Sequence, residues 1–413
     1  MKIYQVGGSV RDRLLGRHPQ DIDYVVTGSS PEEMLARGFV RVGKDFPVFL
    51  HPESKEEYAL ARKEIKTGCR HTDFEFIFDT SVTLREDLER RDFTCNAIAF
   101  DLQTNEYIDP FNGRQDIQNH VLRHINAEHF QEDPLRILRL CRFAAQLGFS
   151  PAPETLELAA KMTAEGQLAH LSPERIWKEL EKALRFPAFP QFIRIARTCG
   201  ALKAILPEVD LLWQTPERTD YHPEANSGNH TLLTLEQAMD GNALIRFGLL
   251  LHDIGKTVTP AEILPSHHHH EQNGLDIIQA ICARLKIPNH YRDFALMSCR
   301  YHMKLCKIPE MRIGTLVDFC EDLTRTGTAD IDNFIEVCRA DMHGCKRTIT
   351  KEEDLIFEQN AARLRQIVAI LQGIKATDMP NFAVLPKDEH FGSLYREFRI
   401  QKVRQILHSA QNN

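Results

Sequence analysis

The sequence predicts an α+β protein, with a mixed-sheet head in about the first 123 residues and an all-α remainder. Two observations carry this prediction. Up to about Arg123, short apolar runs alternate with turn residues, which is the pattern of half-buried strands. From Asp133 onward, apolar residues recur at helical spacing and strand signals nearly vanish, so sheet and helices are segregated along the chain.

The first elements of the head are predicted to be a strand, a helix and a second strand. Ile3–Val6 is a short apolar run that ends at Gly7 and Gly8. Val10–Leu15 has helical spacing, and Asp21–Val26 has the composition of a strand. A strand, a glycine turn and a helix in this order can bring backbone N–H groups to a bound anion.

Asp21 and Asp23 are predicted metal ligands. In a strand, residues two apart project to the same face, so both carboxylates can bind the same hard cations. Such a pair suits Mg²⁺ ions that bridge a nucleoside triphosphate and an attacking hydroxyl. Alone, the pair would more simply be a solvated strand edge, and the glycines only a turn. Their order and spacing, with Arg11 in the first turn of the helix, favour a phosphoryl-transfer site.

A second cluster begins where the helical part begins. Asp133 before Pro134 predicts an N-cap followed by a first-turn proline. Spacing of three then places Asp133, Arg136, Arg139 and Arg142 along one side of the helix. The alternative is the charged face of an ordinary amphipathic helix.

Asp133 and Arg136 together could select a base. A carboxylate only accepts hydrogen bonds and a guanidinium only donates them. Cytosine and adenine both present an amine beside a ring-nitrogen acceptor, whereas uracil and guanine present the opposite pattern. Each mismatch would leave a desolvated polar group unpaired, at a cost of about 1–3 kcal/mol. The pair therefore predicts selection of C and A without a nucleic-acid template.

At this point the chain resembles a known family. In order, its motifs are similar to those of the bacterial CCA-adding enzymes, the tRNA nucleotidyltransferases. The motifs are Gly7–Asp12, Asp21–Asp23, Arg90–Asp92, Ile108–Gly113, Glu132–Arg136 and Ser172–Glu179. Ser172 and Pro173 are equally well explained as an N-cap and a first-turn proline.

The resemblance implies a nucleotidyltransferase head that uses Mg²⁺ and acts on tRNA with CTP and ATP. By the same resemblance, Asp21 and Asp23 would be catalytic residues that hold Mg²⁺. Asp92 would lie near the ribose. The nucleotide-binding residues would be Gly8, Arg11, Arg91, Asp92, Asp133, Arg136 and Arg139.

The second half contains a separate set of candidate metal ligands. His252 and Asp253 are adjacent within an apolar context and resemble an HD phosphohydrolase centre. An adjacent His and Asp can bind one divalent ion such as Ni²⁺ or Mn²⁺, and Mg²⁺ or Fe is also compatible. A chance His-Asp pair and a loop of histidines are the alternative. The predicted metal ligands are His230, His252, Asp253 and Asp341, with His267–His270 and His302 nearby in the dispersed pattern.

The presence of both halves implies the multifunctional members of this family. Their added domain is associated with phosphatase, 2′-nucleotidase and 2′,3′-cyclic phosphodiesterase activities. The tail from Lys375 onward departs from the family's usual Gly/Pro-rich pattern. The predicted domains are a nucleotidyltransferase head (1–123), a helical neck and body (124–220), an HD domain (221–345) and a helical tail (346–413), with a linker near Pro207, Pro216 and Pro223.

Composition is compatible with this prediction. The 413 residues hold no run of about 20 apolar residues and no apolar signal segment, so neither a membrane nor secretion is expected. Ten cysteines show no disulfide pattern, which favours a reducing cytoplasm. Homo-oligomerisation stays open. The net charge of −7 excludes indiscriminate coating of nucleic acid. Any tRNA-binding surface must be local, and the candidates are Arg62, Lys63, Lys66 and Arg70 in the head and Arg396, Arg399, Lys402 and Arg404 in the tail.

Two alternatives remain at this stage. A bacterial poly(A) polymerase would share the head motifs but use ATP alone. An RNA-binding or end-repair protein would act mainly through the HD domain. The intact pair of Asp21 and Asp23 argues against an inactive head.

Overall fold

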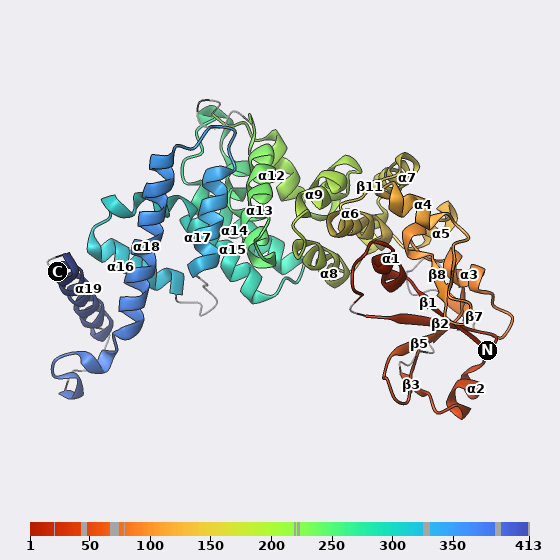
Figure 1. The fold of residues 1–413 in the computed structure, drawn as a ribbon. Helices are drawn as coiled ribbons and strands as arrows, with labels where there is room; N and C mark the ends of the chain where they lie inside the picture. The colour runs from red at the N-terminus through yellow and green to blue at the C-terminus, as the bar shows by residue number, and fades with distance from the viewer. Residues whose placement is uncertain are drawn as a thin grey trace. The chain divides into compact units, whose positions relative to one another are not determined.

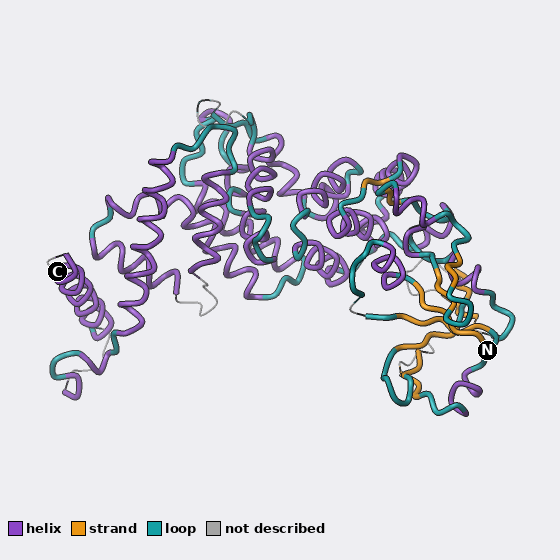
Figure 2. The backbone as a smooth tube through the Cα atoms, in the orientation of Figure 1, coloured by secondary structure: helices purple, strands orange, loops and turns teal. Residues whose placement is uncertain are grey.

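The computed structural model describes residues 1–19, 21–42, 48–66, 74–77, 79–218, 220, 224–324, 331–384 and 390–411. The chain forms two compact units. The first comprises Met1–Ala183 and Gln191–Ile205, and the second comprises Leu184–Pro190 and Leu206–Asn413. Among the described residues, every strand lies in the first unit and the second is helical (Figure 2), which confirms the α+β prediction.

A mixed seven-stranded sheet forms the beginning of the first unit (Figure 1, red to orange). Strand β1 pairs antiparallel with β2 and β8, and the central strand β2 is parallel to β5. The sheet runs in the order β3 (Val40–Val42), β4 (Val48–Leu50), β5 (Glu57–Leu60), β2 (Asp23–Thr27), β1 (Lys2–Val6), β8 (Ala99–Asp101) and β9 (Glu106–Ile108). Two small sheets pair β6 (Lys63–Lys66) with β7 (Phe74–Ile77) and β10 (Val121–Leu122) with β11 (Ser150–Pro151).

Alternation along the strands builds a core on each face of the sheet. Val6 and Val25 belong to one buried cluster, and Tyr24 and Val26 belong to the other. Because β2 is buried on both faces, its apolar residues fix the register of the sheet.

Strand β2 begins two residues later than the sequence predicted. The strand begins at Asp23, so the prediction that Asp21 lies within it is wrong. Val6 is the last residue of β1 and pairs with Asp23. Gly7, with φ 74°, then turns the chain into helix α1 (Gly8–Leu14), so Asp21 has no partner on β1.

The helices from α6 onward follow the predicted helical periodicity, whereas α2 to α5 precede Asp133, where that prediction begins. Helix α6 begins just after Pro134, and the Asp133 Oδ1 atom accepts the N–H of Leu135 at 3.1 Å, which confirms a capping role for Asp133. The helices are α2 (Pro31–Ala36), α3 (Leu84–Glu89), α4 (Gly113–Gln118), α5 (Ala127–Glu132), α6 (Leu135–Leu147), α7 (Pro153–Ala164), α8 (Pro173–Leu184), α9 (Phe189–Thr198) and α10 (Ala201–Ile205), with 3₁₀ turns η1 (Thr94–Asn96) and η2 (Gln167–His170).

Helices build the whole described part of the second unit. α12, α13 and α17 pack against one another, and α13 also packs against α15 (Figure 1, green to blue). The α-helices are α11 (Pro207–Asp210), α12 (Ser227–Gln237), α13 (Ala243–Leu251), α14 (His270–Arg284), α15 (Asn289–Tyr301), α16 (Ile313–Thr324), α17 (Ile331–His343), α18 (Lys351–Gly373) and α19 (Phe391–Gln411). The 3₁₀ segments are η3 (Leu211–Gln214), η4 (Ile254–Val258), η5 (Ala261–Ile263), η6 (His302–Glu310), η7 (Ala376–Asp378) and η8 (Phe382–Val384).

The segment predicted as a linker is folded where it is described. Pro207 begins α11, and the side chains of Val209 and Leu212 are buried. Pro216 forms a bridge with Asn226, while Pro223 lies outside the described residues. Burial of these apolar side chains explains why the prolines start and bend elements here and do not mark an extended connection.

Both predicted basic clusters contain ion pairs. In the tail, Arg396 binds Asp318 and Arg399 binds Glu321, which fastens α19 to α16. In the head, Lys63 lies 3.6 Å from Glu86, and Arg70 is outside the described residues. The tail cluster is therefore largely structural.

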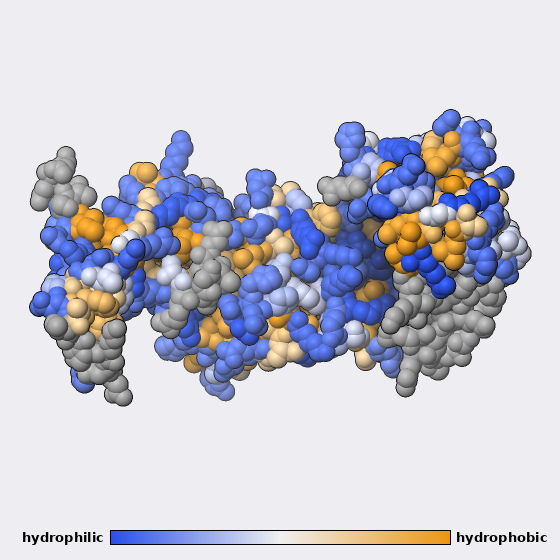
Figure 3. Space-filling model, turned by 90° about the horizontal axis from the view of Figure 1, so that it is seen from below, coloured by the Kyte–Doolittle hydropathy of each residue, from blue (hydrophilic) through white to orange (hydrophobic). Residues whose placement is uncertain are grey.

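The surface is consistent with the composition. On the face shown in Figure 3, hydrophilic side chains dominate the helices of the second unit, and hydrophobic residues appear in patches between them. Within the described ranges, every helix is too short or too polar to cross a membrane.

Two candidate active sites

The first unit contains a cleft of about 790 Å³ that collects every nucleotide-binding and metal-binding residue predicted for the head. Gly7 and Gly8 lie at the start of α1 beside Asp23 and Arg91. A Cβ atom added to Gly7 would lie 2.9 Å from Arg91 Nη1 and 3.7 Å from Asp23 Oδ2. The other lining residues from the prediction are Arg11, Asp21, Asp92, Asp133, Arg136 and Arg139.

The carboxylates of Asp21 and Asp23 form the acidic part of this cleft. Both residues are exposed. Burial raises the pKa of Asp23, the Arg91 guanidinium lowers it, and the neighbouring Asp21 carboxylate raises it again. The net rise is due mainly to desolvation, and repulsion from the Asp21 carboxylate makes a smaller contribution. This donor set fits a hard divalent cation, which binds carboxylate oxygen and would remove that repulsion.

Asp92 organises the arginines of the cleft from below its surface. The residue is 6% exposed, and its Oδ1 atom accepts bonds from the Phe93 N–H and the Asn96 amide, both at 2.9 Å. Its Oδ2 atom accepts Arg139 Nε at 2.7 Å, and Asn96 in turn accepts Arg11 Nη1 at 2.7 Å. Burial alone would raise the pKa of Asp92, but Arg139 and Asn96 lower it to about 2. Both carboxylate oxygens are thus engaged within the protein.

Asp133 and Arg136 line the same cleft, and each of them also contacts other groups of the protein. The Asp133 carboxylate accepts Arg175 Nη2 at 2.8 Å. Arg136 donates to the backbone carbonyls of Arg90, at 2.7 Å, and His129. The prediction missed Arg175, although it stands two residues after Pro173 in a motif that had been identified. The contact between Arg175 and Asp133 depends on how α8 packs and could not be seen in the sequence.

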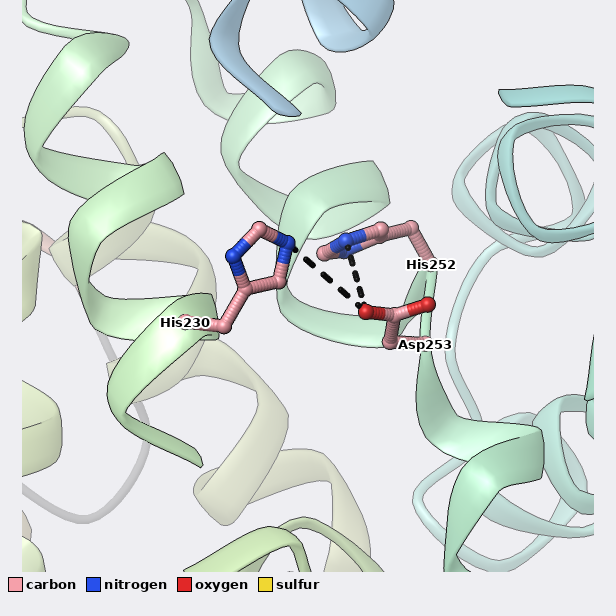
Figure 4. A group of neighbouring side chains, drawn as sticks. All are labelled: His230, His252 and Asp253. Atoms are coloured by element: carbon pink, nitrogen blue, oxygen red, sulfur yellow. Dashed lines mark ion pairs between the residues drawn. The ribbon is translucent and has the colours of Figure 1, made fainter. Parts of the chain in front are cut away.

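The second unit brings together all four metal ligands predicted for the HD domain. His252 directly follows α13, Asp253 comes next, His230 lies on α12 and Asp341 lies on α17. His230 Nε2 lies 2.9 Å from Asp341 Oδ1 and 3.8 Å from Asp253 Oδ2. His252 Nε2 lies 3.3 Å from Asp253 Oδ2, so both imidazoles point at the same carboxylate oxygen (Figure 4).

Asp253 also belongs to a second group of candidate metal ligands, with His270 and His302. Its Oδ1 atom lies 3.4 Å from His270 Nε2 and 3.6 Å from His302 Nε2. His270 belongs to the run of four histidines, and its place in the first turn of α14 distinguishes it from its neighbours. Each group could hold one metal ion, with one oxygen of Asp253 on each side.

The histidines are oriented as ligands. The Nδ1 atoms of His252, His270 and His302 all lie within 3.1 Å of backbone carbonyls, which makes Nδ1 the protonated nitrogen. Their Nε2 lone pairs then face the carboxylate oxygens of Asp253. Two acceptors face each other stably only when a cation or a proton lies between them. His252 Nε2 and Asp253 Oδ1 are buried and lack hydrogen-bond partners among the described residues, which fits a role as cation ligands.

The pKa values lead to the same conclusion. Burial lowers the pKa of His252, but the adjacent Asp253 and Asp341 raise it to about 10. Burial likewise lowers the pKa of His230, and Asp341 and Glu224 raise it to about 9. For His302, burial dominates and the pKa falls to about 4. The buried carboxylates therefore require positive charge, which a divalent ion can supply.

Lys256 adds a fixed positive charge that the sequence prediction did not use. Its Nζ atom lies 2.8 Å from both Asp253 Oδ2 and Glu217 Oε1, and the lysine is 7% exposed. Burial alone would lower the pKa of Lys256, but the two carboxylates raise it above its ordinary value. Glu217 is held in turn by Ser227 Oγ at 2.6 Å. Lys256 lies on η4, three residues after Asp253, and this spacing could have predicted the ion pair from the sequence.

Three family models match the chain. They describe a Poly A polymerase head domain (residues 3–123), a probable RNA and SrmB- binding site of polymerase A (residues 148–212) and an HD domain (residues 228–333).

Curated relatives extend the similarity over the full chain. A Multifunctional CCA protein from Acinetobacter baumannii is 43% identical over 418 residues, which cover 100% of this chain and 99% of the relative. A protein of the same description from Laribacter hongkongensis is 50% identical over 349 residues, covering 83% of this chain and 85% of the relative.

Solved structures share the fold. The Bacillus stearothermophilus CCA-adding enzyme in complex with CTP has a TM-score of 0.63 at 22% identity, covering 100% of this chain and 95% of that one. A CCA-adding enzyme in an apo form has a TM-score of 0.63 at 19% identity, covering 98% of this chain and 86% of that one. At these identities the likeness shows the common fold.

Proposed function

The chain belongs to the family of multifunctional CCA proteins, and from that premise we propose how its two sites divide the work on tRNA 3′ ends. The head adds or repairs the CCA sequence from CTP and ATP without a nucleic-acid template. The HD domain is a phosphohydrolase. The observation that supports this division is that each predicted set of ligands gathers in its own unit. The head set lines one pocket, and His230, Asp253 and Asp341 line another, with the fully buried His252 in contact with Asp253.

In the head, Asp21 and Asp23 would hold Mg²⁺. The bound ion would neutralise the triphosphate and favour ionisation of the RNA 3′ hydroxyl. Arg11, Arg91 and Arg139 supply positive charge for the phosphates, and Gly8 lets the backbone approach them. The 3′ oxygen bonds to the α-phosphorus, the bond to the β-phosphate breaks, and pyrophosphate leaves.

Base choice falls to the residues around Asp133. Its carboxylate accepts an exocyclic amine, and Arg136 donates to the adjacent ring nitrogen, so cytosine and adenine match while uracil and guanine do not. Arg175 supports this role because its Nη2 atom donates to both oxygens of the Asp133 carboxylate and fixes its orientation. Asp92 acts as a positioning residue through Arg139 and Asn96.

In the HD domain, His230, His252, Asp253 and Asp341 would hold one divalent ion, and Asp253, His270 and His302 a second. Ni²⁺ or Mn²⁺ suits these imidazole and carboxylate ligands. Bound there, such ions polarise the phosphate and favour ionisation of a water. Hydrolysis joins the water oxygen to phosphorus, breaks one ribose P–O bond and leaves a proton on the released ribose oxygen. The expected substrates are 2′,3′-cyclic and terminal phosphates.

Domain boundaries and location complete the proposal. We place the head at 1–123, neck and body at 124–220, the HD domain at 221–345 and the tail at 346–413, supported by the family matches within the first three ranges. A cytoplasmic location is supported by the free thiols of all nine cysteines in the described part of the chain.

The deciding experiment supplies CTP and ATP separately to purified protein with tRNA that ends before, within or after CCA. We expect CTP use on tRNA that lacks its terminus and no addition to the complete end. Use of ATP alone would assign the head to poly(A) synthesis. Loss of incorporation in the Asp21→Ala, Asp23→Ala double variant would show that the head performs it.

A further inference from the structure

The pocket that holds the HD ligands extends well beyond them. Its volume is about 570 Å³, which lies in the range of sites for whole small molecules, about 300–1,000 Å³. Asp253, His270 and His302 line one part of it, and one face of α18 lines another. The site therefore has room for more of a substrate than its phosphate.

The α18 face is suited to a flat apolar group. Ile356, Phe357 and Asn360 all line the pocket. Asn360 lies four residues after Ile356 and three after Phe357, so it shares a side of the helix with both. Met303 from η6 lines it as well. Ile356 and Met303 are 43% and 39% exposed, so both are available for contact. Apolar side chains of this kind pack against the face of a heteroaromatic ring.

Asn360 carries the observation that points to a specific ligand. It lines the same pocket and is only 4% exposed, yet its amide nitrogen has no hydrogen-bond partner among the described residues. Buried polar groups are almost always paired, because leaving one unpaired destabilises the fold. A side-chain amide offers both donors and an acceptor, the complement of the polar edge of a nucleobase.

We propose that this part of the pocket is a nucleoside subsite of the phosphohydrolase. The scissile phosphate lies at the cluster of histidines and Asp253. The attached base packs on Ile356 and Met303, and its edge pairs with the Asn360 amide. Asn360 is therefore a specificity-determining residue, which favours phosphoesters that carry a base over those that lack one. This inference rests on the proposed phosphohydrolase function.

The test compares two phosphodiesters in the full-length protein with Mn²⁺. Adenosine 2′,3′-cyclic monophosphate contains a base, and methyl ribofuranoside 2′,3′-cyclic phosphate has the same cyclic diester without a base or any other aromatic ring. In Asn360→Leu we expect KM for the cyclic nucleotide to rise about tenfold, with kcat/KM for the base-free diester unchanged. The matched control is Gln359→Leu, which removes an exposed amide from the adjacent position and should change neither substrate.

Two further measurements keep the outcome clear. If the Asn360 amide serves a ligand, it does not stabilise the free protein. The midpoint temperature of unfolding of Asn360→Leu should then equal or exceed that of wild type. Ile356→Ser, at an exposed position, should also raise KM for the cyclic nucleotide alone.

Equal losses on both substrates, or an unchanged ratio between them, would overturn the subsite. A fall in the unfolding temperature of Asn360→Leu without a change in KM would show that the amide pairs with structural water. Failure of the wild type to hydrolyse either substrate would instead refute the phosphohydrolase function itself.

Discussion

The two sites assemble metal-binding carboxylates in opposite ways. Asp21 and Asp23 are exposed in an open cleft, whereas Asp253 is 2% exposed and lies among four histidines and a lysine. In the head, water screens the repulsion between the carboxylates, so they can stay charged without a resident cation. In the HD cluster water is excluded, so the carboxylates must be neutralised by protons or by a resident cation.

This difference indicates how each site is coupled to stability. Exposed charges contribute little to the free energy of unfolding, so two neighbouring carboxylates in the head destabilise the fold only slightly. Buried charges contribute strongly in either direction. Substitutions in the head should therefore affect activity more than stability, and ion binding to the HD cluster should affect both.

The largest expected effect is the separation of the two activities. Asp23→Asn keeps the size of the side chain but removes the charge that binds Mg²⁺, so nucleotide addition should fall by orders of magnitude. Hydrolysis of cyclic phosphate by the same preparation should be unchanged. His252→Ala should give the reverse pattern. Parallel incorporation and hydrolysis assays measure both, and a variant that loses both activities would contradict independent sites.

The second prediction concerns resident metal. Removing divalent ions with a chelator and then adding Mn²⁺ should raise the unfolding temperature of the protein, because an ion bound only by the folded state stabilises it by roughly 3 kcal/mol at 100 times its Kd. Asp253→Asn, which removes the carboxylate shared by the two ligand groups, should abolish this rise. The matched head variant Asp21→Asn should leave it intact. An equal rise in both variants would mean that the ion binds elsewhere.

Both candidate sites could be predicted from the sequence, because their residues form short motifs with a recognisable order and spacing. The adjacent His252 and Asp253 and the spacing of Gly7, Gly8, Asp21 and Asp23 sufficed to name both sites. Sequence could not show that β2 begins only at Asp23, because the length of its partner β1 sets that end. Nor could it pair Arg175 with Asp133, which are 42 residues apart. Sequence also could not show which of the four consecutive histidines is a metal ligand. That depends on where α14 begins, because the start of the helix places His270 beside Asp253.

The third prediction is a pH dependence of stability in the head. The pKa of Asp92 falls from its ordinary value of 3.8 to about 2 in the folded protein, which corresponds to about 2 kcal/mol. Because the folded pKa is the lower one, this stabilisation is present above about pH 3.8 and is lost as the pH falls towards 2. Asp92→Asn should therefore be less stable than wild type at pH 6, and the difference in free energy of unfolding should shrink below pH 3.8. Denaturant unfolding at pH 6 and at pH 3 measures it, and a difference that grows on acidification would refute the assignment.

The smallest expected effect tests whether the open head positions its base-selecting carboxylate through a salt bridge. Arg175 and Asp133 are each 27% exposed, so their pairing is worth about 0–1 kcal/mol. Arg175→Ala should therefore reduce the preference for CTP over UTP by no more than about fivefold, measured as the ratio of kcat/KM values. Asp133→Ala removes the acceptor itself and should reduce that preference further, while Arg175→Lys should restore part of it. If Arg175→Ala and Asp133→Ala were equally unselective, Arg175 would read the base directly. If Arg175→Ala lowered stability without changing the ratio, the salt bridge would only join α8 to the start of α6, and the geometry of the Asp133 carboxylate would have to be fixed by its bond to the Leu135 N–H.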